Sequence, residues 1–196
     1  MTSLFIAIEG PHAVGKSTIA NLLATCLGTR TGRPVHPTSE PTDTPLGRRL
    51  RASASVLPGR PLALAVAADR AAHVEAEIIP ALDNGHHVVT DRYVQTSMVL
   101  QRVDGLDLDE IWSYNQYVLP ATSVYLEDKP DAITGRSLQR ASLSRLEMVG
   151  TARRELELYG EAREFLARED WQQHVIDCHG KDPDHIVAAI LDMINA

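Results

Sequence analysis

The sequence predicts a three-layer α/β/α domain in which a five-stranded parallel sheet lies between two layers of helices. Short apolar runs alternate with longer amphipathic stretches along the whole chain, as expected of repeated β-α-β units. The first apolar run ends in a glycine-rich segment that leads directly into a helical pattern. The length of 196 residues suits one such domain, and no linker or repeat divides it, so we expect residues 1–196 to form a single unit.

The expected strands are apolar runs that end in polar or turn-forming residues: 4–8, 33–39, 86–90, 122–126 and 174–177. The expected helices fill the intervals: one ending at Gly28 to Gly32, then 46–56, 61–83, 94–101, a segment with Trp112 and Tyr114, 131–140, a charged stretch to about 168, and the C-terminal stretch. We expect Pro80 to kink the long third helix, and Asp182 or Asp184 to cap the last one. Trp112 and Tyr114 are assigned to the core or to a dimer face.

A phosphate-binding loop follows the first strand. Gly10, four further residues and then Gly15, Lys16 and Ser17 have the spacing of loops whose N–H groups point at phosphate oxygens. We expect Lys16 to reach the β- and γ-phosphates and Ser17 to hold Mg²⁺. The alternative is a glycine-rich turn with an incidental lysine, which the preceding strand and the following helix disfavour. The loop residues expected to contact phosphate are Gly10, Ala13, Val14, Gly15, Lys16, Ser17 and Thr18.

The composition limits the classes of partner. A net charge of −7 argues against binding of long nucleic acid, because a phosphate backbone requires a basic surface, but it leaves nucleotides open. The two cysteines lie far apart, and Cys26 is expected to be a buried free thiol. We expect no secretory leader and no membrane span, and therefore a protein of the reducing cytoplasm.

Polar residues follow four of the expected strands, at Glu9, Glu40, Asp91-Arg92 and 127–128. Ligands of parallel sheets bind at the carboxyl ends of the strands, and at three of these ends we expect acids or arginines without a structural role. Asp91 suits Mg²⁺ or the orientation of a nucleophile, and Arg92 can clamp a phosphate with two hydrogen bonds. The alternative is an aspartate that caps a helix, followed by a solvated arginine.

Further motifs occur in a fixed order along the chain. They are Glu9-Gly10 to Thr18, Glu40-Pro41, Leu46-Gly47, Arg51, Ala67-Ala68-Asp69-Arg70, Asp91-Arg92-Tyr93, Arg136, Arg140 and Arg145-Leu146-Glu147. In this order and spacing the chain resembles the thymidylate kinases over essentially its whole length. The phosphate loop alone is generic, whereas the Asp-Arg-Tyr run with Ala-Ala-Asp-Arg before it is much more specific.

The resemblance implies transfer of the γ-phosphoryl group of ATP to dTMP, with Mg²⁺ at Ser17 and Asp91. It implies that Arg92 grips the acceptor phosphate and that Arg70 bonds the base. It also implies a short helical lid over about 136–147 and a homodimer. The catalytic residues so implied are Lys16, Asp91, Arg92, Arg136, Arg140 and Arg145. The substrate-binding residues so implied are His12, Glu40, Arg51, Val66, Arg70, Arg92, Tyr93, Ser97, Leu100 and Gln101.

The lid arginines fit the chemistry independently of the resemblance. Phosphoryl transfer brings two anions together, so cations are required around the transferred group. Arg136 and Arg140 are four residues apart and share a helix face, and Ala13 shows that the phosphate loop carries no arginine of its own. The alternative is a solvated basic face paired with Glu147 and Glu155.

Some residues depart from the family and leave the acceptor open. Thymidylate kinases usually have an acid at His12, where it bonds the sugar 3′-hydroxyl, a phenylalanine at Val66 that stacks on thymine, and commonly a tyrosine at Leu100. One alternative is therefore the same reaction on a different or modified nucleoside monophosphate. Another is a regulatory nucleotide-binding protein, against which Arg70, Arg92 and the lid arginines argue.

Overall fold

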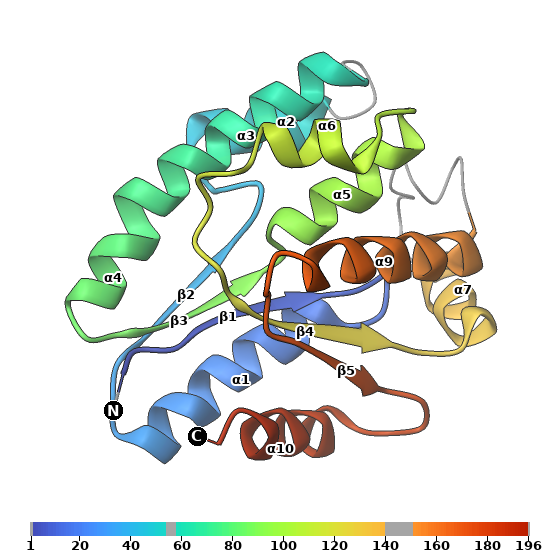
Figure 1. Ribbon diagram of the computed structural model, residues 1–196. Helices are drawn as coiled ribbons and strands as arrows, with labels where there is room; N and C mark the ends of the chain where they lie inside the picture. Colours follow the sequence, from blue (N-terminus) through green and yellow to red (C-terminus); the bar gives the residue numbers. More distant parts are fainter. Residues whose placement is uncertain (1, 54–57, 140–150, 196) are drawn as a thin grey trace.

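The computed structural model describes residues 2–53, 58–139 and 151–195. Its centre is a five-stranded, all-parallel sheet in the order β2-β3-β1-β4-β5 (Figure 1). The strands are β1 (Phe5–Glu9), β2 (Val35–Ser39), β3 (His87–Asp91), β4 (Thr122–Glu127) and β5 (Gln173–Asp177). Each overlaps a strand predicted from the sequence, which confirms the predicted fold class.

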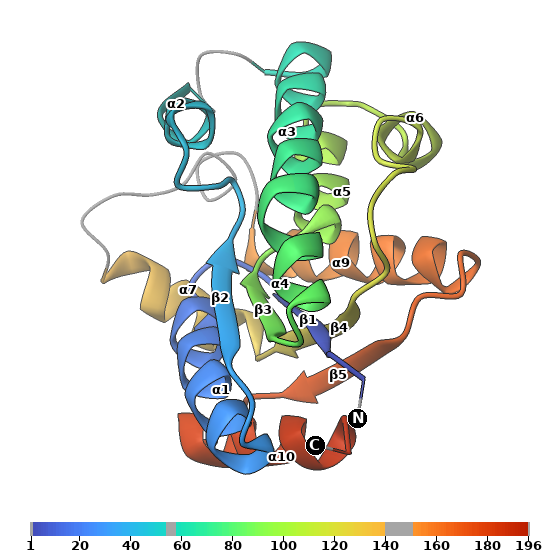
Figure 2. The ribbon, with the colours of Figure 1, turned by 90° about the vertical axis from the view of Figure 1, so that its left-hand side faces the viewer.

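Helices cover both faces of the sheet. On one face α1 (Lys16–Thr31) packs against α10 (Pro183–Met193). The opposite face carries α3 (Arg60–His73), α4 (Ile79–Asp83), α5 (Val94–Val103), α6 (Leu108–Ser113) and α9 (Ala152–Ala167) (Figure 1). Beyond the carboxyl end of β2 lies α2 (Pro45–Ser53), in contact with α3, and α7 (Pro130–Leu138) follows β4 (Figure 2). Within the described ranges, no helix combines the length and the apolar character that crossing a membrane requires.

The side-chain alternation of β1 divides the core between the two faces. Phe5 and Ala7 belong to the cluster beneath α5 and α9, whereas Ile6 and Ile8 belong to the cluster beneath α1 and α10. All four side chains are buried, because a central parallel strand is covered on both faces. The apolar run that begins the sequence therefore anchors both layers, and the phosphate loop starts at its end.

The long helical segment that begins at Arg60 changes its winding before Pro80. It runs through α3, then a π-helical turn over Val74–Ile78, labelled η1, and then α4. Proline lacks an N–H and its ring crowds the carbonyl four residues earlier, and a wider turn at this point relieves both effects. The structure has this π turn where the sequence predicts a kink. The segment ends as predicted at Asn84, with Gly85 in a left-handed conformation (φ 80).

The structure decides several smaller predictions. Asp182 caps α10, because its Oδ1 accepts a hydrogen bond of 2.9 Å from the backbone N–H of His185. The ring of Trp112 packs edge-on against Phe165 and Trp171, which places it against the core. The end of the helix predicted over 131–140 and the start of the charged stretch after it lie outside the described residues.

Candidate active site

The loop between β1 and α1 is shaped for an anion. Gly10 and Gly15 have φ values of 137 and 111, which a residue with a side chain rarely adopts. At Gly10 a Cβ atom would lie 2.4 Å from the carbonyl oxygen of Leu126, so only glycine fits there. The side chain of Lys16 folds back over the loop, and its Nζ donates to the carbonyl oxygens of Gly10 at 2.8 Å and Pro11 at 2.7 Å. The predicted loop is therefore present, with its lysine placed across it.

Lys16 is a buried cation whose hydrogen-bond acceptors are neutral. Burial, assisted by the positive charge of Arg92, lowers the pKa of its ammonium group to about 7, although Asp91 and Glu9 oppose the shift. A buried charge is costly unless an opposite charge compensates it. The loop thus suits a polyphosphate, because an anion bound here would supply the missing negative charge.

Ser17 and Asp91 form a pair of oxygen ligands beside the loop. Ser17 Oγ donates to Asp91 Oδ2 at 2.5 Å, and the other oxygen, Asp91 Oδ1, is buried with no hydrogen-bond partner in the described part of the chain. A cavity of about 350 Å³ opens next to them, with Thr38 and Ser39 of β2 on its other side. Mg²⁺ prefers hydroxyl, carboxylate, phosphate and water oxygens and is commonly held by one or two protein ligands, so the pair fits this ion.

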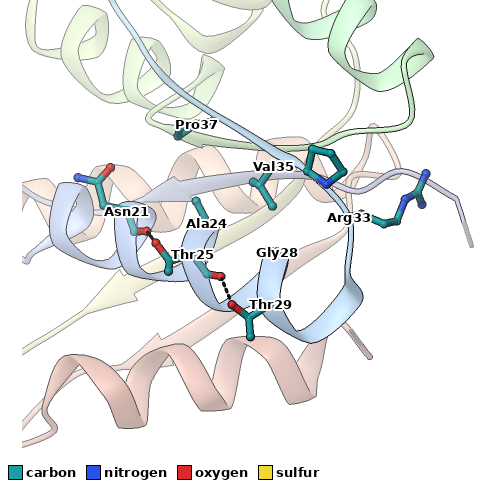
Figure 3. Close-up of a pocket in the computed structure, with 9 residues that line it drawn as sticks. Asn21, Ala24, Thr25, Gly28, Thr29, Arg33, Val35 and Pro37 are labelled. Atoms are coloured by element: carbon teal, nitrogen blue, oxygen red, sulfur yellow. Dashed lines mark hydrogen bonds between the residues drawn. The ribbon is translucent and has the colours of Figure 1, made fainter.

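A second groove, of about 580 Å³, lies between α1 and the outer strand β2 (Figure 3). Its polar groups do not converge on a ligand. The hydroxyls of Thr25 and Thr29 donate to the α1 carbonyls of Asn21 and Thr25, each at 3.1 Å. The cavity beside Asp91 is therefore the better candidate for the site.

Glu9 has a structural role that the sequence does not predict. Its buried carboxylate accepts hydrogen bonds from the backbone N–H of Tyr93 at 2.6 Å and from the Thr96 hydroxyl at 2.7 Å. Burial raises the pKa of this carboxyl group to about 7, against the lowering effect of those bonds and of the Arg92 and Lys16 charges. The expectation that acids at strand ends lack a structural role is wrong here, because Glu9 fixes the start of α5.

Arg92 directly precedes Tyr93, whose N–H is bonded to Glu9, and has a left-handed backbone conformation with φ 76. Its guanidinium is only lightly held. In the described part of the chain its one hydrogen bond joins Nη1 to Thr96 Oγ1 at 3.5 Å. A half-buried arginine beside the phosphate loop, with so few hydrogen bonds to the described residues, can bind a second anion.

Arg70 is held in the opposite way, because each nitrogen of its guanidinium donates a hydrogen bond. Its Nε donates to Glu40 Oε2 at 2.7 Å, Nη1 to Asn115 Oδ1 at 2.6 Å, and Nη2 to Ser97 Oγ at 2.8 Å. Burial lowers the pKa of the guanidinium, but the charge of Glu40 and its hydrogen bond outweigh burial, so the pKa is raised. The expectation of no structural role is also wrong for Glu40. Asn115 belongs to no motif, so no sequence signal predicts its role here.

Glu155 of α9 reaches the phosphate loop. Its carboxylate accepts the backbone N–H of His12 at 2.8 Å and contacts His12 Nδ1 at 2.5 Å. Burial lowers the pKa of His12, and the hydrogen bond to Glu155 only partly offsets that effect. Glu155 is therefore buried against the loop, and Arg136 pairs with Asp128 instead of with it. The other members of the alternative, in which a solvated basic face pairs with Glu147 and Glu155, lie outside the described residues.

Of the predicted lid arginines, the structure places Arg136, on α7. Its Nε donates to the carbonyl oxygen of Ala13 at 2.9 Å, and Nη2 donates to Asp128 Oδ2 at 2.7 Å. It thus links α7 to the phosphate loop. Arg140 and Arg145 lie outside the described residues, as does most of the predicted lid.

The other predicted substrate residues lie on α2, α3 and α5. Arg51 donates to the carbonyl oxygen of Pro41. Val66 and Leu100 are half-buried, on helices that contact each other. Gln101 is buried, and its Oε1 has no hydrogen-bond partner in the described ranges, which leaves an acceptor for a ligand. The Tyr93 ring is packed in the core against Phe5, so its substrate contact stays a prediction.

Comparison with known proteins agrees with this geometry. A model of the thymidylate kinase family matches residues 8–177. A protein named "Probable thymidylate kinase" from Pyrobaculum aerophilum is 30% identical over 195 residues, 97% of this chain and 95% of its own length. Another of that name from Thermococcus kodakarensis is 38% identical over 138 residues, covering 65% and 67% of the two chains. A "Thymidylate kinase" from Bacillus licheniformis is 33% identical over 141 residues, covering 67% and 66%.

The lowered pKa of Lys16 predicts that polyphosphate binding takes up a proton. With a pKa of about 7, most of the ammonium groups are deprotonated at pH 8. A bound anion raises this pKa toward its ordinary value, so binding should take up nearly one proton at pH 8, and affinity should fall as pH rises above 7. Calorimetry with tripolyphosphate in buffers of different ionisation enthalpy measures the uptake.

Two variants assign that proton. Lys16→Arg carries a guanidinium that stays protonated and should abolish the extra uptake. Lys181→Arg, a change at an exposed lysine, should preserve it. Equal uptake in wild type and Lys16→Arg would show that another group takes the proton.

Proposed function

The chain belongs to the thymidylate kinase family, and on that premise we propose that it transfers the γ-phosphoryl group of ATP to dTMP, giving dTDP and ADP. One observation carries the proposal. A buried lysine in a phosphate loop and a lightly held arginine lie close enough that the charge of Arg92 lowers the pKa of Lys16. Two anion sites in such proximity suit a donor and an acceptor phosphate.

The donor side uses the loop. We assign the phosphates of ATP to the positive end of α1 and to these loop residues: Gly10, Ala13, Val14, Gly15, Lys16, Ser17 and Thr18. Ser17 and Asp91 would hold Mg²⁺, which supplies charge neutralisation on the transferring group when it is bound. Arg136, fixed to Ala13, adds a further positive charge beside the loop.

The acceptor side uses the residues after β3 and on α3 and α5. Arg92 would hold the acceptor phosphate, one oxygen of which forms the new bond to the γ-phosphorus while the bond from that phosphorus to the β-γ bridging oxygen breaks. A phosphate oxygen is already nucleophilic, so the chain needs no strong base, and its task is positioning and charge compensation. We assign the base to Arg70, Ser97 and Gln101. We assign a polar group of the acceptor to His12, which Glu155 holds.

The proposal extends to the remaining family features. Arg140 and Arg145 would complete the lid over about 136–147. A cytoplasmic homodimer follows from the resemblance, and the 49% exposure of Leu64 on α3 is apolar surface that a second copy could cover.

An activity panel tests the function. Purified protein with ATP and Mg²⁺ should phosphorylate dTMP faster than other nucleoside monophosphates. Lys16→Ala should remove the activity while circular dichroism and thermal unfolding show a folded chain, because the loop then lacks its charge at the transferring group. A wild-type preference for a different monophosphate would contradict the assignment of dTMP. Near-normal turnover by folded Lys16→Ala would contradict the donor site.

Replacing Arg92 tests the acceptor clamp. Arg92→Ala should lower kcat/KM for dTMP more than tenfold, about 1.4 kcal/mol or more, while the affinity for ATP changes much less. Arg30→Ala, at an exposed arginine paired with Asp192, is the matched control and should leave both quantities unchanged. Equal losses for the two nucleotides would place Arg92 in the donor site or in a structural role.

Val66 tests the base pocket. Val66 precedes Arg70 by four residues on α3, so both side chains lie on one face of the helix. Val66→Phe should add a stacking surface and favour dTMP over the best alternative acceptor by about 1–3 kcal/mol in kcat/KM. An unchanged ratio in a folded protein would show that Val66 does not contact the base.

A further inference from the structure

A chain of buried hydrogen bonds leads from Arg70 through Glu40 to His73. Arg70 Nε donates to Glu40 Oε2 at 2.7 Å, and His73 Nδ1 lies 3.0 Å from Glu40 Oε1. The three side chains are at most 4% exposed. On its other side His73 Nε2 lies 2.8 Å from Thr38 Oγ1. These bonds join α3 to the end of β2.

The contact with Glu40 places a hydrogen on Nδ1 of His73. A carboxylate that already accepts from a guanidinium can only accept from the ring, so Nδ1 carries a hydrogen and donates it to Glu40. On the other side of the ring, Nε2 contacts the oxygen of Thr38, whose hydroxyl donates to Glu77 Oε2. Glu77, in the π turn that starts directly after His73, lies 3.3 Å from the same hydroxyl and 3.7 Å from Nε2. The ring is therefore held between two defined partners, one on each nitrogen.

Glu40 depends on this donor. In the described part of the chain, the side-chain groups that hydrogen-bond to its carboxylate are Arg70 and His73, one on each oxygen. A buried carboxylate oxygen that loses its donor is costly, and the group must turn or admit water to satisfy it. Because the second oxygen binds Arg70 Nε, a turn of the carboxylate changes the direction of the guanidinium.

We propose that His73 is a positioning residue for the acceptor base: its Nδ1–H orients Glu40, and Glu40 orients Arg70. This inference rests on the proposed function, in which Arg70 bonds the base. Ser97 and Asn115 hold the terminal nitrogens of the guanidinium, whereas Glu40 holds Nε and so sets the tilt of the plane. His73 itself lies one helical turn from Arg70 and touches the substrate only through this chain of bonds.

Two amide substitutions separate the roles of the two ring nitrogens. The side-chain amide of His73→Asn reaches the place of Nδ1, and that of His73→Gln reaches the place of Nε2. His73→Gln should raise the KM for dTMP about fivefold or more, with kcat and ATP affinity within about twofold of wild type, because acceptor binding alone is disturbed. His73→Asn should restore the wild-type KM. His36→Gln, a change at a half-exposed histidine on β2 that contacts Glu77, is the control and should behave as wild type.

An NMR measurement tests the positioning of Arg70 without an activity assay. The Nε–H signal of Arg70 in a ¹H–¹⁵N spectrum, assigned by its loss in Arg70→Lys, should shift in His73→Gln and remain in place in His73→Asn. An unmoved signal and KM in folded His73→Gln would overturn the inference, as would equal effects of both amides, because packing of the ring would then be its only role. If His73→Gln does not fold, His73→Asn still tests the inference. The inference requires that His73→Asn has the wild-type KM for dTMP and the wild-type position of the Arg70 Nε–H signal. A wild-type protein inactive on dTMP would contradict the proposed function, whereas the Arg70 signal would still test the positioning.

Discussion

The buried carboxylate of Glu9 is the contact on which the site depends. It is the last residue of the central strand, and the phosphate loop begins with the next residue. By accepting the N–H of Tyr93 and the hydroxyl of Thr96, it ties the end of β1 to the first turn of α5. Arg92 lies in the short connection between β3 and that turn, where φ is 76. One buried acid therefore sets the distance between the loop that would hold the donor and the arginine that would hold the acceptor.

Two buried cations of the site, Lys16 and Arg70, differ in their hydrogen-bond partners and therefore suit different ligands. Lys16 donates to two neutral carbonyl oxygens, and burial lowers its pKa, whereas Arg70 faces the carboxylate of Glu40 and its pKa is raised. Removing one partner of a buried ion pair typically costs about 3–5 kcal/mol, so Arg70 is fixed firmly in place. The acceptors that Lys16 has within the described residues are neutral, so its ammonium group gains most when an anion binds. Fixed geometry suits recognition of a base, and an uncompensated charge suits binding of phosphate.

Much of the fold follows from local patterns, and the contacts within the site do not. Apolar runs of five residues, a glycine after a strand and a capping aspartate at Asp182 are short-range signals, and they predict the sheet, the loop and the start of α10. The partners of His12 and Arg70 lie far away in sequence, 143 residues for Glu155 and 45 for Asn115. Composition and periodicity carry no information about such pairs. The same limit explains why the sequence does not predict the structural roles of Glu9 and Glu40, since only the folded chain brings their donors to them.

The acids of the site are arranged so that they do not repel phosphate. Glu9 accepts from an N–H and a hydroxyl, Glu40 from Arg70 and His73, Glu155 from His12, and Asp128 from Arg136. Each of these carboxylates is therefore directed toward a donor of the protein. Within the described ranges, Asp91 Oδ1 is the buried carboxylate oxygen that has no such donor. In a site that must bring two anions together, an unpartnered carboxylate oxygen suits a bound cation, and this one belongs to the carboxylate that Ser17 contacts through Oδ2 beside the cavity.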